Sequence, residues 1–80
     1  FEPHKALFAG KKGLEFYLVL VKFAPFLLKD GGALLVEVGF RQASSVARVF
    51  NEAGFSEVEI SSDSNGHGRV VKGLFSKLKP

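Results

Sequence analysis

Cysteine, methionine and tryptophan do not occur in this chain of 80 residues, and proline occurs only three times. Without cysteine, disulfide bonds and thiolate metal sites are excluded. Long apolar runs are missing too, because the longest, residues 16–28, is interrupted by Lys22 and Pro25. A transmembrane helix needs roughly 20 consecutive apolar residues. The chain is therefore not expected to span a membrane.

The charge balance is mild, with 11 Lys and Arg against 8 Asp and Glu and a net charge of +3. Nucleic acid is not an expected partner, because proteins that bind it carry a larger basic excess. Hydrophobic residues make up 46% of the chain, yet a chain this short rarely gains more than about 3–5 kcal/mol from its own core. It opens on Phe1 without an initiator methionine or a basic-then-apolar leader, and we expect it to be a piece of a larger protein.

Residues 14–29 show apolar residues on two faces of a helix, with one narrow polar stripe. A helix that is apolar over most of its circumference needs cover on more than one side, and the rest of this chain can hardly supply it. Pro25 has no amide hydrogen and its ring clashes with the preceding turn, so a break or kink is predicted near Ala24.

A strand and a second helix are predicted next. Residues 33–38 form an apolar run without polar alternation, which is typical of a strand buried on both faces of a parallel sheet. Residues 42–53 have the spacing of an amphipathic helix. Gly54 is expected to end this helix in the left-handed conformation, with Phe55 folding back onto it.

Two further strands are predicted near the end of the chain. Residues 57–60 alternate with period two, and residues 69–75 are rich in valine. Residues 61–68 between them are turn formers, so the two strands are expected to run antiparallel. The predicted order is helix, strand, helix, strand, strand, with the last strand inserted between the other two.

Short motifs follow one another along the chain, from Phe1 to about Leu74. They are Phe1-Glu2-Pro3, Ala6-Leu7-Phe8-Ala9-Gly10, Gly13-Leu14-Glu15-Phe16-Tyr17, Leu28-Lys29-Asp30-Gly31-Gly32, Leu35-Val36-Glu37-Val38-Gly39, Gln42, Ala53-Gly54-Phe55, Asp63 and Arg69-Val70-Val71. In this order and spacing they resemble the carboxyl-terminal part of HemK-type methyltransferases. The Glu-Pro-x-x-Ala-Leu start and the Glu-x-Gly end of the first predicted strand are the most specific of them.

The resemblance implies an enzyme that transfers a methyl group from S-adenosylmethionine to the side-chain amide (N5) of a glutamine in peptide chain release factors, in the cytoplasm. It implies an α/β fold class, the C-terminal half of a Rossmann-like class I methyltransferase sheet with its last strand antiparallel. Residues 1–80 would be the C-terminal portion of the catalytic domain. Within it, residues 1–13 would form the loop after the upstream catalytic motif, and residues 14–80 the helix-strand-helix-strand-strand unit.

The motifs that bind cofactor and substrate in this family are not among the 80 residues. The family has a glycine-rich turn after the first strand of its sheet and an Asn-Pro-Pro-Tyr motif that holds the substrate amide, and neither occurs here. We therefore expect no catalytic residue in the chain, no S-adenosylmethionine bound by this segment alone, and no activity of the segment by itself. Its expected partners are the release factor and the missing N-terminal part of the same enzyme.

Four residues are candidates for the substrate pocket or its support. By resemblance, Glu2 and Pro3 follow the catalytic motif and are expected to border the glutamine site, although anchoring the loop is an equal alternative. Glu37 ends the predicted strand at the sheet edge where α/β proteins bind ligands. Structural pairing with Arg69 is favoured for Glu37, because an unpaired buried carboxylate would cost several kcal/mol.

Other interpretations are weaker or belong to another class. The chain is alternatively a non-enzymatic α/β interaction module that buries its apolar surface by dimerising or by docking on a partner. Serine, aspartate and histidine all occur within residues 61–67, but the members of a catalytic triad converge from separate elements, so a turn is predicted there. Two histidines without clustered acids indicate no metal site.

Overall fold

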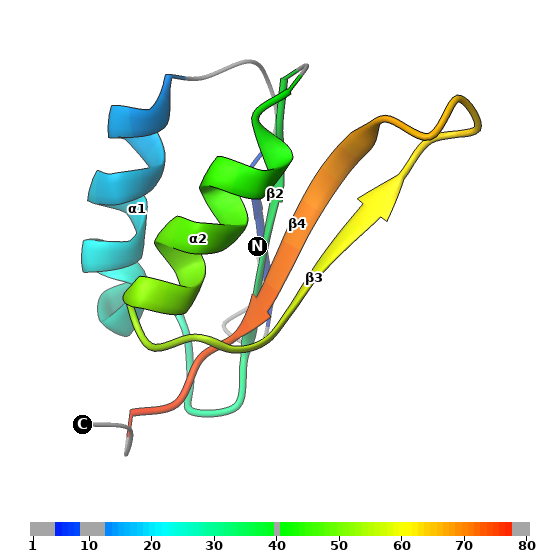
Figure 1. Ribbon diagram of the computed structural model, residues 1–80. Helices are drawn as coiled ribbons and strands as arrows, with labels where there is room; N and C mark the ends of the chain where they lie inside the picture. Colours follow the sequence, from blue (N-terminus) through cyan, green and yellow to red (C-terminus); the bar gives the residue numbers. More distant parts are fainter. Residues whose placement is uncertain (1–4, 9–12, 40, 78–80) are drawn as a thin grey trace.

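Four strands and two helices make up residues 5–8, 13–39 and 41–77, which the computed structural model describes (Figure 1). They are β1 (Lys5–Phe8), α1 (Leu14–Leu27), β2 (Ala33–Glu37), α2 (Ala43–Glu52), β3 (Ser56–Ser62) and β4 (Gly68–Leu74). The strands form one sheet in the order β1-β2-β4-β3. β1 runs parallel to β2, whereas β4 runs antiparallel to both of its neighbours.

The α/β class and the antiparallel direction of the last strand are as the sequence predicts. Within the ranges that the structure describes, neither helix has the length and hydropathy that crossing a bilayer requires.

β1 corrects the expectation of a loop over residues 1–13. Lys5 to Phe8 pair in parallel with Ala33 to Val36 of β2. Ala6 is buried and Lys5 is exposed, as in the alternation of a strand. The prediction was wrong because four residues are too few to show a period of their own, and only the pairing with β2 makes them a strand.

Of the break or kink predicted near Ala24, the break does not occur, because α1 continues to Leu27. Pro25 lies inside the last turn, where its missing amide hydrogen removes one helical hydrogen bond. The turn is still closed, since the Leu28 N–H donates to the Ala24 carbonyl at 2.9 Å. The helix therefore ends about one turn later than the proline suggests.

Both helices lie on one face of the sheet, and the core lies between the two layers (Figure 1). The buried side chains come from both helices, from three of the strands and from the segments that follow them: Ala6, Tyr17, Leu20, Ala24, Leu28, Leu34, Val36, Val38, Val46, Val49, Phe50, Phe55 and Val71. Residues 34, 36 and 71 alternate with less buried neighbours along their strands. The helix-facing side of the sheet is therefore the apolar one.

The C-terminus of α2 ends as the sequence predicts. Gly54 has φ of 94°, in the left-handed region that glycine adopts without strain. The Phe55 N–H donates to the Phe50 carbonyl at 3.0 Å, and the two rings pack with centroids 5.1 Å apart. This cap directs the chain from α2 into β3.

Candidate functional site

The carboxyl end of β2 is the edge where open α/β sheets bind ligands, and three hydrogen bonds hold its backbone. The Tyr17 hydroxyl of α1 donates to the Glu37 carbonyl oxygen at 2.9 Å. The Val38 N–H donates to the Arg69 carbonyl at 2.9 Å. The Gly39 N–H donates to Oε1 of Gln42 at 2.8 Å. Side chains from α1 and from the start of α2 thus position this end of the strand.

Burial raises the pKa of the Tyr17 hydroxyl above its usual value of 10.0. The hydroxyl therefore stays protonated over the physiological range and remains a hydrogen-bond donor. Tyr17 is 1% exposed, and a buried tyrosine normally finds a partner for its hydroxyl. Here the partner is the backbone of Glu37, which ties α1 to the candidate site.

The Glu37 side chain is exposed, so the burial that would have required an ionic partner does not occur. The pairing expected between Glu37 and Arg69 differs from what the structure has. The Arg69 Nε donates to Oδ2 of Asp63 at 2.7 Å. Glu37 is opposite Val70 in the ladder. Because strand side chains alternate between faces, Arg69 points to the other face of the sheet from Glu37.

Asp63 organises the turn between β3 and β4. Its Oδ1 accepts hydrogen bonds from the N–H groups of Asn65 and His67 at 2.9 and 3.0 Å. The hydrogen bond from Arg69, followed by those from the backbone, lowers the pKa of Asp63 from 3.8 to about 2. Gly66 has φ of 83° within the same turn. The segment is a hydrogen-bonded turn, as its composition predicts.

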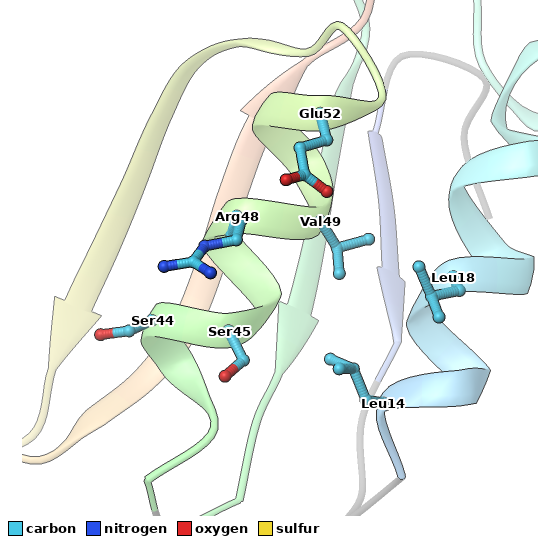
Figure 2. Close-up of a pocket in the computed structure, with 7 residues that line it drawn as sticks. All are labelled: Leu14, Leu18, Ser44, Ser45, Arg48, Val49 and Glu52. Carbon is cyan, nitrogen blue, oxygen red and sulfur yellow. The ribbon is translucent and has the colours of Figure 1, made fainter.

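A groove of about 290 Å³ lies between the two helices. Leu14 and Leu18 of α1 face α2 across it (Figure 2). The α2 side is lined by Ser44, Ser45, Arg48, Val49 and Glu52. The groove combines an apolar wall with hydroxyls and two opposite charges.

Glu2 and Pro3, the other two predicted pocket residues, lie outside the described residues. Among residues 5–8, 13–39 and 41–77, no group of three or more His, Asp and Glu side chains is placed to hold a metal ion.

The described residues show no buried, unpaired polar side chain that would fit S-adenosylmethionine. The Gly39 N–H already donates to Oε1 of Gln42. Among the described residues, no buried side-chain nitrogen or oxygen lacks a hydrogen-bond partner. A site prepared for a polar cofactor would leave donors or acceptors unpaired and converging on it. We therefore derive no step of chemistry through the cofactor from these residues.

Tyr17 and Gln42 are the site residues that the sequence analysis left without a role. Tyr17 appeared only within the predicted helix and a family motif, although the single tyrosine of such a helix signals a buried hydroxyl that needs an acceptor. Gln42 appeared only as part of a motif. Its side chain closes the turn from β2 into α2. In the same turn the Gln42 N–H donates to the Gly39 carbonyl at 3.1 Å.

No protein-family model matches the chain. Curated proteins do match it. A release factor glutamine methyltransferase of Geobacter sulfurreducens is 44% identical over 73 residues, which are 91% of this chain and 26% of that protein. Another of the same name, from Clostridium botulinum, is 40% identical over 90% of this chain and 25% of its own length. A bifunctional methyltransferase of Rickettsia typhi is 40% identical over 72 residues and 14% of its length. The chain thus spans about a quarter or less of these relatives.

A crystal structure agrees with these matches. It is described as a protein-(glutamine-N5) methyltransferase (release factor-specific) from Alicyclobacillus acidocaldarius, and it covers 91% of this chain at a TM-score of 0.72 and 30% identity. The chain covers 48% of that structure. The sheet with its two helices is thereby that of a class I methyltransferase. Within this class, the chain corresponds to the C-terminal part of HemK-type release factor glutamine methyltransferases.

Proposed function

We propose that this chain belongs to a protein methyltransferase that methylates the side-chain amide nitrogen of a glutamine in a peptide chain release factor. The proposal is supported best by agreement at two levels, each over 91% of the chain: 44% identity to a relative of that name and a TM-score of 0.72 to a crystallised one. The methyl donor would be S-adenosylmethionine. When bound in the parent, it would supply an electrophilic methyl group on its sulfonium sulfur.

An amide nitrogen is a poor nucleophile, so this reaction depends on holding it in line with the methyl group. By the family resemblance, the Asn-Pro-Pro-Tyr motif does this, and it lies outside the 80 residues. The proposed contribution of the segment is half of the sheet and one wall of the pocket, bordered by Glu2, Pro3 and Glu37. Tyr17 and Gln42 would keep that wall in place through the backbone of β2. A release factor substrate would place the parent in the cytoplasm.

A chimera tests the proposal directly. The matching 73-residue segment of the Geobacter sulfurreducens relative is replaced by this chain, and transfer of labelled methyl from S-adenosylmethionine to a purified release factor is measured. We expect methylation of one glutamine, located by mass spectrometry. The same relative truncated before the segment should give none. A chimera that melts cooperatively but leaves every glutamine unmodified would contradict the proposal.

The isolated chain provides a complementary test. Titration calorimetry of the 80 residues with S-adenosylmethionine should show no heat, because the described residues lack a donor set for it. Micromolar binding would contradict the placement of the cofactor site in the preceding part of the parent.

A second candidate function is supported by a specific observation. Large hydrophobic side chains on α1 are exposed, including Phe23 at 53% and Phe26 at 83%. An interaction module that dimerises would use such a surface. It predicts a concentration-dependent dimer of the 80-residue chain in analytical ultracentrifugation, and a monomer at all concentrations would contradict it.

A further inference from the structure

The turn between β3 and β4 contains the sequence Asn65-Gly66, and both residues are exposed. Glycine has no Cβ to shield its backbone nitrogen, and nothing lies within 4 Å of the position that a Cβ of Gly66 would occupy. The side-chain carbonyl carbon of an asparagine and the backbone nitrogen of the next residue are close enough in the chain to join in a small ring. This pair is therefore a candidate for covalent modification.

The reaction is deamidation, which is one reason why asparagine is a thermolabile residue. The Gly66 nitrogen bonds to the side-chain carbonyl carbon of Asn65, the carbon–nitrogen bond of the side-chain amide breaks, and ammonia leaves with the proton from the Gly66 nitrogen. Water then opens the cyclic imide at one of its two carbonyl carbons. One opening gives an aspartate at position 65. The other gives an isoaspartate, whose backbone runs through the former side chain and is one methylene longer.

Hydrogen bonds hold this turn closed but lie at the surface. The Gly66 N–H donates to the Asp63 carbonyl at 3.0 Å, and this bond must open before the nitrogen can attack. The N–H groups of Asn65 and His67 donate to Oδ1 of Asp63, and both of these bonds are exposed. Segments held by solvent-exposed hydrogen bonds open locally at a small cost in free energy. The folded protein is therefore expected to allow the reaction.

The turn lies near the candidate site. It leads into Arg69, whose carbonyl accepts the hydrogen bond from the Val38 N–H that follows β2. Figure 1 shows the turn projecting away from both helices. A change in the turn would therefore affect the start of β4, beside the end of β2.

We propose that Asn65 is a deamidation site and that an isoaspartate at this position opens the turn held by Asp63. The added methylene would lie between the N–H groups of residues 65 and 67, which now share one carboxylate oxygen. Both could not keep hydrogen-bond distance to it after the backbone is lengthened. The activity of the parent takes no part in this chemistry, so the inference is independent of the proposed function.

Peptide mapping by mass spectrometry tests the modification. The 80-residue chain and the chimera with the Geobacter sulfurreducens relative are incubated at mildly alkaline pH, and deamidation is measured as a gain of one mass unit. Asn51, the other asparagine of the chain, is exposed on α2 and precedes Glu52, so it is the internal control. We expect Asn65 to react at least about tenfold faster than Asn51. Asn65→Gln, which would have to close a larger ring, should show no gain at position 65.

Equal rates at positions 51 and 65 would overturn the assignment of the site. The effect on the turn is tested by NMR titration of the Asp63 carboxyl, with Asn65→Asp as a control that adds the charge without the longer backbone. We expect the pKa of Asp63 to rise from about 2 further towards 3.8 in the isoaspartate form than in this variant, because backbone donors are lost. The same pKa in both proteins would show that the turn stays closed and would overturn that part of the proposal.

Discussion

α1 and α2 lie side by side on the same face of the sheet but bury their side chains differently (Figure 1). α2 turns Val46, Val49 and Phe50 into the core, and most of its other residues are polar. α1 also buries three residues, Tyr17, Leu20 and Ala24. Its remaining surface, however, carries most of the exposed large hydrophobic side chains of the described residues.

The difference lies in how much apolar surface of each helix the two-layer arrangement covers. The core of this chain is sufficient to cover the apolar face of α2. α1 has more apolar surface than the two-layer arrangement hides. Substitutions in the two helices and in their contacts separate the two cases.

The largest effect is expected at Phe50 of α2. The side chain is 0% exposed, and Phe50→Ala should cost about 3–5 kcal/mol in the free energy of unfolding, through lost burial and a cavity. Because a chain this short rarely gains more than about 3–5 kcal/mol from its own core, the isolated variant should be largely unfolded without urea, and circular dichroism against the unsubstituted chain measures this. A loss below about 1 kcal/mol would contradict the full burial of the apolar face of α2 in the core.

The same substitution on α1 should depend on context. Phe26→Ala in the isolated chain should change the free energy of unfolding by less than about 0.5 kcal/mol, because the ring is already 83% exposed. In the chimera with the Geobacter sulfurreducens relative, burial of the ring should raise the cost to about 2–3 kcal/mol. If Phe26→Ala lowered the free energy of unfolding equally in both proteins, α1 would have no more uncovered apolar surface than α2.

Gly73 tests how tightly α2 is packed. A Cβ at this position would come within 2.9 Å of Cδ2 of Phe50 and 3.1 Å of Cβ of Phe55. Gly73→Ala should therefore cost about 1–3 kcal/mol by overpacking. Gly13→Ala serves as a control for the space, since nothing lies within 4 Å of a Cβ there. An unchanged melting temperature for Gly73→Ala would contradict the close packing of Phe50 and Phe55 against Gly73.

A substitution at Tyr17 tests the hydrogen bond that links α1 to the end of β2. Tyr17→Phe keeps the ring and removes the donor to the Glu37 carbonyl, so a loss of about 0.5–1.5 kcal/mol is expected. Hydrogen exchange should rise at the amides of residues 37–39. Unchanged exchange there would show that the hydroxyl does not hold the end of β2.

The smallest effect is expected in the turn outside both helices. Because the pKa of Asp63 is lowered from 3.8 to about 2, its contribution to stability is complete above about pH 3.8 and is lost as the pH falls towards 2. Arg69→Gln should return the pKa towards 3.8, since the hydrogen bond from Arg69 is its main cause. NMR titration of the Asp63 carboxyl measures this. An unchanged pKa would mean that the backbone donors suffice.

The elements with a strong local pattern could be predicted closely. Residues 42–53 were expected as a helix and Ala43–Glu52 form α2, because the helical period and Gly54 agree on its extent. The strands expected over 33–38 and 69–75 match β2 and β4 within one residue at each end. Here the periodicity or apolar run is present in the segment itself.

The error at Glu37 concerns the partner of a side chain. The prediction placed the backbones of Glu37 and Arg69 close together, and they are, since the Val38 N–H donates to the Arg69 carbonyl. The side-chain partner was wrong because a shift of one residue in register exchanges the faces of a strand. The Arg69 side chain donates its hydrogen bond instead to Asp63, six residues away in the same hairpin.

The order of amino acids alone determined the α/β class, the extents of α2 and β4, and an excess of apolar residues between positions 14 and 29, because each depends on neighbours a few residues apart. Only the tertiary structure decided that residues 5–8 are a strand, that Tyr17 supports the end of β2, and which flank of α1 is left uncovered. These features arise from pairings across the sheet and between layers, and no local periodicity encodes the partner of such a pairing.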